Sequence, residues 1–469
     1  MTAARRWPIL LLIALAARAL TFGNPLVHAD EQFYFAVARG MWHGQLPYLD
    51  IWDRKPLGLF LLYMPAAALP LPWGTLAYQA MALACVVATA AIVARLAERA
   101  GWQGGALAAG AAYILWLDLL NGSSGQSPVF YNLPVALAAW LVATRGDRRA
   151  GLAAMALIGV ALQIKPAAVF EGVFLGLWLL RTEWRARWNL PALAAYAAAL
   201  VALALLPTLA AWGFYAAHGA GAAWWQANVT AVFDRRSEPA AVLLHNATKL
   251  LLVLSPLLGM AAGSRAQGGD AHMRRFLFAW LAVAVSGVVA FGGWFDHYGL
   301  PIVAPAAACA GGFFAGAGRR FIAPILLAAA LAGQIKLGLD RSGRGDGADL
   351  ARLTAAIRRQ PPGPLFVYTG EPLLYPESGR PTLSRYLLPS HLYLAREDGA
   401  VGTSQATELR RILAARPEVI VVAPHYKLER PDIRATMLRT LASGYTLAER
   451  VPFGSGEVAV YRLRSSTAR

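Results

Sequence analysis

The feature that most constrains the fold is a series of apolar segments that recurs through most of the chain. Each is close to the roughly 20 residues that an α-helix needs to cross a bilayer. Eleven such segments lie at 7–24, 76–96, 104–120, 130–144, 150–164, 166–181, 190–216, 241–262, 275–292, 298–316 and 321–338. Of the 469 residues, 57% are hydrophobic and only 15% are charged, whereas an ordinary soluble protein has about 25% charged residues. The sequence therefore predicts a mainly α-helical, polytopic membrane protein.

The formal charge of +17 can indicate nucleic-acid binding, but the positions of the basic residues argue against it. They form short clusters between apolar segments, which is the pattern of cytoplasmic loops in membrane proteins. The clusters lie at 5–6, 95–99, 145–149, 181–187, 265–275 and 319–320. Eleven spans place all of them on one side, provided that the proline-interrupted segment 57–73 does not cross. We therefore expect an interfacial or re-entrant position for 57–73, and an outer position for loop 25–75.

The C-terminal part of the chain has a different composition and is expected to form an external domain. Residues 341–348 are rich in Gly, Arg and Asp, which is typical of a linker. Beyond them, helical patterns at 349–359, 405–415 and 431–442 alternate with strand patterns at 365–369, 419–423 and 458–463. These patterns predict a small soluble α/β domain. The expected organisation is a transmembrane domain at 1–340 and an extracytoplasmic domain at 341–469.

Loop 25–75 contains several charged side chains of the kinds found in catalytic sites. It contains Asp30-Glu31, Asp53, Arg54 and one of only five lysines, Lys55. A carboxylate at a wet membrane face can act as a general base on a hydroxyl, and neighbouring cations can hold a phosphate. Such a set suits a reaction between a hydroxyl and a phosphate-bearing lipid. The alternative interpretation is a solvated loop whose charges only form salt bridges.

Several motifs in this chain resemble the membrane glycosyltransferases of the GT-C superfamily, in the branch of protein O-mannosyltransferases and the lipid A aminoarabinose transferase. The resemblance rests on Asp30-Glu31, Pro47-Tyr48, the run from Asp50 to Gly58, Lys165-Pro166, His297-Tyr298, Gly370-Glu371 and Ser384-Arg385-Tyr386. The motifs extend over most of the chain, and residues 30–58 are the most specific part. Leu57 departs from the pattern, since a second proline is usual there.

The resemblance implies a GT-C bundle whose donor is a polyprenyl-phosphate sugar. The sugar would pass, with inversion, to a hydroxyl of an envelope glycan, lipid or protein at the outer face. Asp30 would be the general base, with Glu31 assisting. Lys55 would bind the donor phosphate and stabilise the leaving group, while Asp53 positions Lys55 or contacts the acceptor. No metal or other cofactor is required if cationic side chains neutralise the phosphate.

Five further residues are candidates for substrate binding, each with a structural alternative. Lys165 lies at an outer span end, where it either binds substrate or extends to the interface as lysines commonly do. Arg235 and Arg236 lie on an outer loop against the positive-inside trend, which suggests anion binding, with a purely structural role as the alternative. His297 can donate to a phosphate or serve as an interfacial histidine. Tyr298 can contact substrate or belong to an aromatic belt.

Two other functions compete with sugar transfer. A transporter or lipid flippase would place charged residues near mid-membrane, whereas most charges here lie at span ends and Glu171 is the main exception. A non-catalytic envelope scaffold leaves the acidic and lysine-bearing loop unexplained. The Ala- and Arg-rich composition suggests a bacterium. We therefore expect a multi-pass protein of the bacterial inner membrane, with membrane lipids and a lipid-linked sugar as partners and no nucleic acid.

Overall fold

The structure of the protein is a computed structural model that describes residues 3–186 and 188–464. Arg187, at the end of the predicted basic cluster 181–187, and residues 465–469 of the predicted C-terminal domain lie outside this part. The chain divides into two compact units. The first, here called the helical unit, comprises Met1–Phe22, Tyr78–Ala211 and Pro239–Gly338. The second, the α/β unit, comprises Gly23–Ala77, Trp212–Glu238 and Leu339–Arg469.

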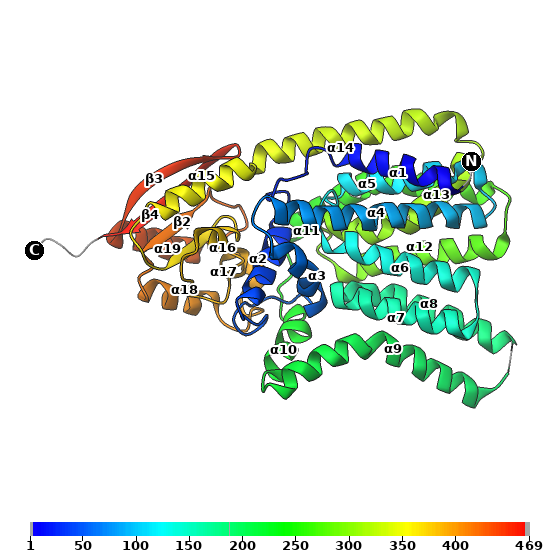
Figure 1. The fold of residues 1–469 in the computed structure, drawn as a ribbon, viewed down its shortest axis with the longest axis horizontal. Helices are drawn as coiled ribbons and strands as arrows, with labels where there is room; N and C mark the ends of the chain where they lie inside the picture. Colours follow the sequence, from blue (N-terminus) through cyan, green and yellow to red (C-terminus); the bar gives the residue numbers. More distant parts are fainter. Residues whose placement is uncertain (1–2, 187, 465–469) are drawn as a thin grey trace, which may run out of the picture. The chain divides into compact units, whose positions relative to one another are not determined.

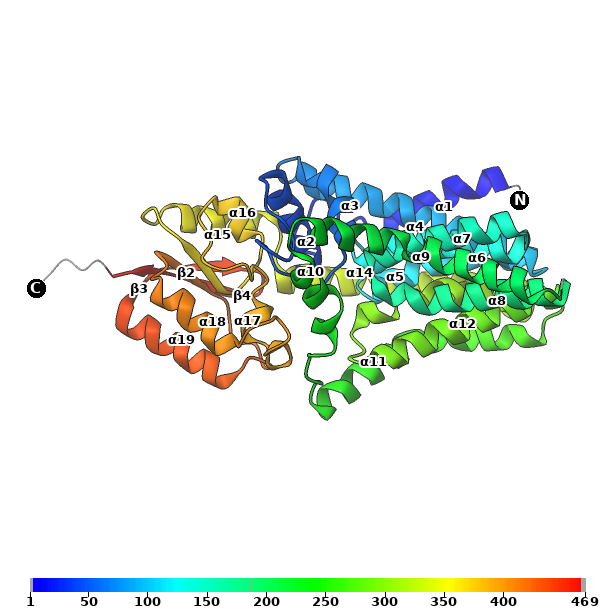
Figure 2. The same cartoon turned by 90° about the horizontal axis from the view of Figure 1, so that it is seen from below.

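A helix is found at each of the eleven predicted spans. They are α1 (Ala3–Ala17), α4 (Trp73–Arg99), α5 (Ala106–Leu119), α6 (Ser127–Thr144), α7 (Arg148–Ile164), α8 (Val169–Ala186), α9 (Leu190–Ala217), α11 (Ala240–Gly263), α12 (Ala271–Phe291), α13 (Leu300–Ala315) and α14 (Ile322–Arg344). Within the helical unit they run side by side as a bundle (Figures 1 and 2). This architecture confirms the predicted polytopic helical fold.

Helix α13 forms the centre of the helical unit, because it packs against α5, α11 and α12. Small residues make this close packing possible, as is common between membrane helices. A Cβ atom at Gly311 would lie 2.7 Å from the Cβ of Ala97, and one at Gly312 would lie 2.7 Å from the Cβ of Ser264. Larger side chains at these two positions would therefore push the neighbouring helices apart.

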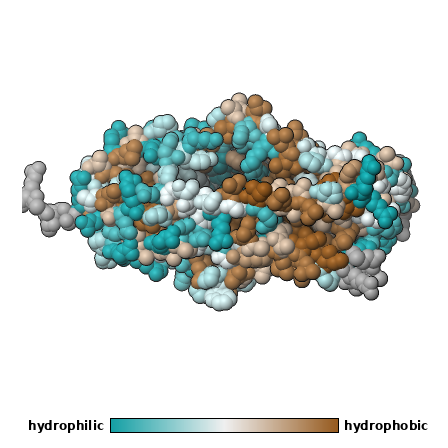
Figure 3. Space-filling model, turned by 90° about the horizontal axis from the view of Figure 1, so that it is seen from above, coloured by the Kyte–Doolittle hydropathy of each residue, from teal (hydrophilic) through white to brown (hydrophobic). Residues whose placement is uncertain are grey.

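Seven helical segments in the described part of the chain are long and apolar enough to cross a membrane. The other four predicted spans correspond to α1, α5 and α7, which have 15, 14 and 17 residues, and to α8, which carries several charges in its second half. Apolar side chains cover much of the surface over the bundle (Figure 3), with Leu252 and Leu327 exposed by 67% and 69%. An apolar exterior of this kind suits contact with lipid, so the protein is an integral membrane protein.

The proline-interrupted segment 57–73 contains no helix of full membrane-spanning length. It contains α3 (Leu57–Ala67), which begins after Pro56, has only 11 residues and is too short to cross a bilayer. Helix α3 belongs to the α/β unit and packs against α2 (Ala29–Trp42). Loop 25–75 therefore contains two helices, α2 and α3, and its interfacial position at the outer face stays a prediction.

The C-terminal part of the α/β unit is built on a four-stranded sheet with the order β1-β2-β4-β3. Strands β1 (Leu365–Thr369) and β2 (Val419–Val422) are parallel, whereas β4 (Gly456–Leu463) is antiparallel to both β2 and β3 (Tyr445–Phe453). The accompanying helices are α15 (Gly347–Arg358), α16 (Leu374–Ser378), α17 (Ser390–Tyr393), α18 (Gln405–Ala414) and α19 (Pro431–Gly444). Figure 2 shows α18 and α19 on one face of the sheet and α15 on the other.

Two sequence-based predictions for this part were incomplete or wrong. Strand β3 was not predicted, because it lies at the sheet edge and most of its side chains are exposed, so it lacks a continuous buried apolar run. The predicted linker at 341–348 is almost entirely helical, since α14 continues to Arg344 and α15 begins at Gly347. The Gly- and Asp-rich composition reflects the caps of these two helices. Gly345 adopts a φ of +91°, and Asp346 and Asp349 form a capping box at the start of α15.

The helix count leads to a topology prediction. If 57–73 does not cross, reporter fusions after residues 99 and 149 should both report a cytoplasmic location, because the basic clusters at 95–99 and 145–149 then face the cytoplasm. Paired alkaline phosphatase and fluorescent-protein fusions would measure this. A periplasmic result at either position would contradict the eleven-span topology.

Candidate functional site

The acidic pair that begins α2 lies at a favourable place for negative charge. The imidazole of His28 caps the helix by accepting a hydrogen bond of 3.2 Å from the backbone N–H of Asp30. Asp30 and Glu31 therefore occupy the first turn, where the helix dipole stabilises carboxylates. The Glu31 side chain is fully buried, whereas that of Asp30 keeps 23% of its surface exposed. Of the two carboxylates, that of Asp30 is therefore the more accessible.

Segment 53–55 lies in the same unit and is electrostatically linked to α2. The Lys55 ammonium lies 4.0 Å from the Asp53 carboxylate and 5.5 Å from the ring centre of Tyr34, which follows Asp30 by one helical turn. Burial raises the pKa of Asp53. The charges of Lys55 and Arg54 oppose this rise, whereas the negative charge of Asp30 adds to it. Asp30, Asp53 and Lys55, three of the predicted site residues, therefore form one interacting cluster.

The Pro47-Tyr48 motif helps to position Lys55. Tyr48 has a φ of +73°, which is unfavourable for a non-glycine residue. Its hydroxyl donates a hydrogen bond of 2.9 Å to the backbone oxygen of Lys55, and its buried ring packs against that of Tyr215 at 5.1 Å. These contacts fix the backbone at the lysine, and they account for the unfavourable backbone conformation at Tyr48.

The two arginines predicted to bind an anion contact acidic residues of the C-terminal segment. An Arg235 guanidinium nitrogen lies 2.8 Å from Glu397, and one of Arg236 lies 3.1 Å from Asp398. The Arg236 backbone N–H also donates to the Arg396 carbonyl. Each arginine therefore has a carboxylate partner, and these ion pairs join the loop before α11 to residues 396–398.

Residues distant in sequence also contact α2 and segment 53–55, and sequence analysis did not identify their roles. Gln32 of α2 donates a hydrogen bond of 2.6 Å to Glu371, whose pKa is raised by burial. The His391 ring is buried against Trp52 with its Nε2 atom 4.0 Å from Asp53. Burial, followed by the nearby positive charges of Arg54 and others, lowers the pKa of His391 to about 3, so its ring is neutral at neutral pH.

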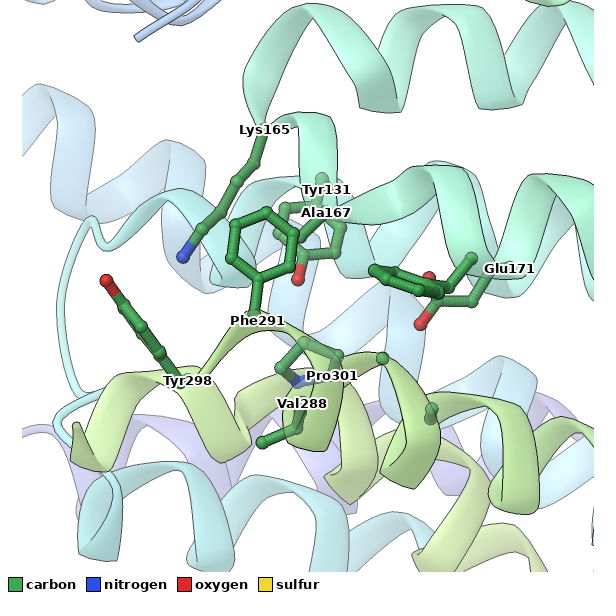
Figure 4. A pocket seen from close by; sticks show the side chains of 11 residues that line it. Tyr131, Lys165, Ala167, Glu171, Val288, Phe291, Tyr298 and Pro301 are labelled. Atoms are coloured by element: carbon green, nitrogen blue, oxygen red, sulfur yellow. The ribbon is translucent and has the colours of Figure 1, made fainter. Parts of the chain in front are cut away.

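A second group of predicted residues surrounds a pocket in the helical unit. Lys165 ends α7 just before Pro166, and its ammonium lies over the ring of Tyr298 at 4.9 Å. Both line a small pocket, together with Tyr131, Ala167, Phe170, Glu171, Ala284, Gly287, Val288, Phe291 and Pro301 (Figure 4). Figure 4 shows the polar ends of Lys165 and Tyr298 directed toward the same space. The pocket therefore combines a cation and a hydroxyl with a mostly apolar wall.

His297 lies beside this pocket but does not line it. Its ring packs edge-on against that of Tyr298 at 4.8 Å. The preceding residue, Asp296, anchors the turn by accepting hydrogen bonds from Lys249 at 2.7 Å and from Asn121 at 3.2 Å. His297 thus contacts the predicted site residue next to it.

The nine predicted site residues therefore form two groups. Asp30, Glu31, Asp53, Lys55, Arg235 and Arg236 belong to the α/β unit, whereas Lys165, His297 and Tyr298 belong to the helical unit. Within residues 3–186 and 188–464, no three His, Cys, Asp or Glu side chains are grouped in a way that could hold a metal ion.

Comparison with known proteins supports the fold. No protein-family profile and no curated protein matches the sequence. The structure is similar to that of ArnT from Cupriavidus metallidurans bound to undecaprenyl phosphate, with a TM-score of 0.63 and 13% identity over 99% of both chains. It is also similar to the Archaeoglobus fulgidus oligosaccharyltransferase in complex with Zn and sulfate, with a TM-score of 0.51 and 13% identity over 89% of this chain and 67% of the other. The chain therefore shares the fold of these two proteins, which confirms the mainly helical fold that the sequence predicted.

Proposed function

We propose that this protein is an integral membrane glycosyltransferase whose donor is a polyprenyl-phosphate sugar. The acceptor is a hydroxyl group of an envelope glycan, lipid or protein at the outer face of the bacterial inner membrane. The observation that carries this proposal is the cluster of Asp30, Asp53 and Lys55, in a chain whose whole length has the fold of an enzyme bound to undecaprenyl phosphate.

The residues of the α/β unit suit a single displacement. Asp30 takes the proton of the acceptor hydroxyl as its oxygen attacks the anomeric carbon. The bond from that carbon to the phosphate oxygen breaks, and the phosphate leaves with the electron pair, so the configuration inverts. Lys55 neutralises the charge that develops on the phosphate. Asp53 holds the Lys55 ammonium, and Glu31 orients the first turn of α2.

Within the helical unit, Lys165, Tyr298 and His297 remain candidates for binding a lipid-linked phosphate. A cation and a hydroxyl above an apolar wall suit a phosphate attached to a hydrocarbon chain. An apolar groove between α8 and α12 shares Phe170 with the pocket, which extends the apolar surface available to such a chain. Arg235 and Arg236 remain candidates for donor contact, but their ion pairs with carboxylates favour a supporting role. The proposal assigns no step to a metal ion or another cofactor.

Mass spectrometry of the cell envelope is the direct test. Glycolipids and glycoproteins from cells with and without the gene should differ by one sugar on one class of acceptor, and the missing sugar identifies the donor. An unchanged set of envelope glycans would contradict the proposal. An assay of the purified protein in detergent distinguishes transfer from transport. A transferase releases polyprenyl phosphate from the lipid-linked sugar even without a membrane, whereas a transporter or flippase leaves the lipid-linked sugar intact.

A further inference from the structure

Glu397 is a buried carboxylate that contacts three arginines from separate parts of the α/β unit. Its side chain is only 4% exposed. One carboxylate oxygen lies 3.3 Å from a guanidinium nitrogen of Arg54, 2.8 Å from one of Arg235 and 3.2 Å from Arg396, and its other oxygen accepts a second bond from Arg54. Burial alone would raise the pKa of Glu397, but the charges of Arg54 and Arg235 outweigh burial and hold it well below its usual range. The carboxylate therefore stays ionised and keeps this cluster together.

Three consecutive residues of the first outer loop are held by the C-terminal segment. The backbone N–H of Trp52 donates to the carbonyl of Arg385 at 2.9 Å, and the Trp52 ring packs against His391 at 4.9 Å. Asp53 lies 4.0 Å from the same histidine. Arg54 then forms the bidentate ion pair described above. The path of the loop just before Lys55 is therefore set by residues more than 300 positions later in the sequence.

Arg54 has a second possible partner within reach, because Asp53 precedes it directly. Asp53 accepts the backbone N–H of Arg54 through Oδ1, and among the described residues its Oδ2 has no hydrogen-bond partner, although the Lys55 ammonium lies 4.0 Å away. A guanidinium released from Glu397 would compete with Lys55 for this carboxylate. The released guanidinium would also be a second cation near the donor phosphate, at a position that differs from that of the Lys55 ammonium.

We propose that Glu397 is a positioning residue for sugar transfer, which holds Arg54 away from Asp53 so that the Asp53–Lys55 pair is presented to the donor phosphate. This inference rests on the proposed function. It gives the C-terminal segment a specific role: residues 385–397 are part of the scaffold of the donor site. Glu397 itself contacts neither Asp53 nor Lys55 and acts through Arg54.

The test uses Glu397→Gln, which keeps the shape of the side chain and removes its charge. In the full-length protein the variant should raise the KM for the lipid-linked sugar about tenfold or more, with a smaller change in kcat. Its affinity for undecaprenyl phosphate, measured by native mass spectrometry, should fall by a similar factor. In an Arg54→Gln background the same substitution should have little further effect on either quantity, because the competing guanidinium is already absent. A purely structural role predicts equal losses in both backgrounds.

Glu408→Gln provides a matched control. Glu408 is another poorly exposed carboxylate of the C-terminal segment, with hydrogen bonds of 2.6 Å from Arg411 and Ser384. Its neutralisation should leave the KM for the lipid-linked sugar unchanged.

The outcomes for Glu397 and for the proposed function can be told apart. If the wild type is active and a folded Glu397→Gln variant has an unchanged donor KM and an unchanged lipid affinity, the positioning role is overturned. If the wild type binds undecaprenyl phosphate but transfers no sugar, the proposed function fails, whereas the binding measurements still decide the role of Glu397. If Glu397→Gln does not fold, two double variants decide the question. Arg54→Gln/Glu397→Gln, which has no cation at position 54, should fold and bind undecaprenyl phosphate more tightly than Arg54→Lys/Glu397→Gln, which keeps one. Any other result would exclude the positioning role.

Discussion

Asp30→Asn is expected to lower the rate of sugar transfer by about a thousand-fold, within the range of 10² to 10⁴ that general-base catalysis contributes. The amide has nearly the same shape as the carboxylate and accepts no proton at neutral pH. Asp30 is also the partly exposed member of the acidic pair in the first turn of α2. The variant should insert into the membrane and bind undecaprenyl phosphate as the wild type does. The measurement is the transfer of radiolabelled sugar from a lipid-linked donor by the purified protein.

Asp50→Asn is a suitable control for this variant. Asp50 lies in the same loop and its carboxylate accepts a hydrogen bond of 2.7 Å from the backbone N–H of Leu46, which an asparagine oxygen can also accept. The substitution removes one negative charge from the loop and leaves Asp30 intact. Its transfer rate should stay within about twofold of the wild type. A folded Asp30→Asn variant with full activity would exclude Asp30 as the base.

The helical part of the fold could be predicted because an apolar segment of about 20 residues has few alternatives in a membrane. Each predicted span has its helix in the structure, although four of these helices are short or charged. The C-terminal strands β1 and β2 were also predictable, since buried strands of a sheet covered on both faces are continuous apolar runs. Edge strand β3 lacks that signal. The caps around Gly345 were interpreted as a linker, because cap residues and linker residues have similar compositions.

The charged cluster of the α/β unit could be predicted only where its residues are close in sequence, whereas Lys165 and Tyr298 of the helical unit were identified from separate motifs. Asp30-Glu31 and Asp53-Arg54-Lys55 stand out as charged motifs within one short loop. In contrast, Arg54 and Glu397 are separated by 343 positions, and no local pattern indicates that they meet. The same holds for Gln32 and Glu371, which are 339 positions apart. Such pairs depend on tertiary packing, so only the structure could identify Glu397 and His391 as neighbours of the loop.

Lys55→Met is expected to lower kcat/KM for the lipid-linked sugar by about 10² to 10³, because it removes the cation assigned to the developing phosphate charge. The methionine keeps the length and apolar part of the side chain, and the ammonium is lost. Affinity for undecaprenyl phosphate should fall together with kcat/KM. A guanidinium does not reproduce the position of the ammonium, so Lys55→Arg should recover only part of the activity. An unchanged donor affinity in Lys55→Met would remove the phosphate role from this lysine.

The same substitution should also change how stability depends on pH. Burial raises the pKa of Asp53 above its ordinary value of 3.8, and the charge of Lys55 is the largest opposing effect. Without that charge, the pKa of Asp53 rises further, and its ionisation in the folded protein costs more. Because the folded state then holds the proton more tightly than the unfolded state, stability is retained at acidic pH and lost as the pH rises. The deficit in Tm of Lys55→Met relative to the wild type should therefore be larger at pH 8 than at pH 5.

Asp53→Asn in the Lys55→Met background separates stability from function. The amide cannot ionise, so the double variant should lose the pH-dependent part of the deficit and recover Tm at pH 8. It has no cation in place of Lys55, so donor affinity should stay as low as in Lys55→Met alone. Recovery of both Tm and donor affinity would mean that Lys55 serves only to neutralise Asp53. Recovery of Tm alone is the result expected if the lysine binds the phosphate and Asp53 holds it in place.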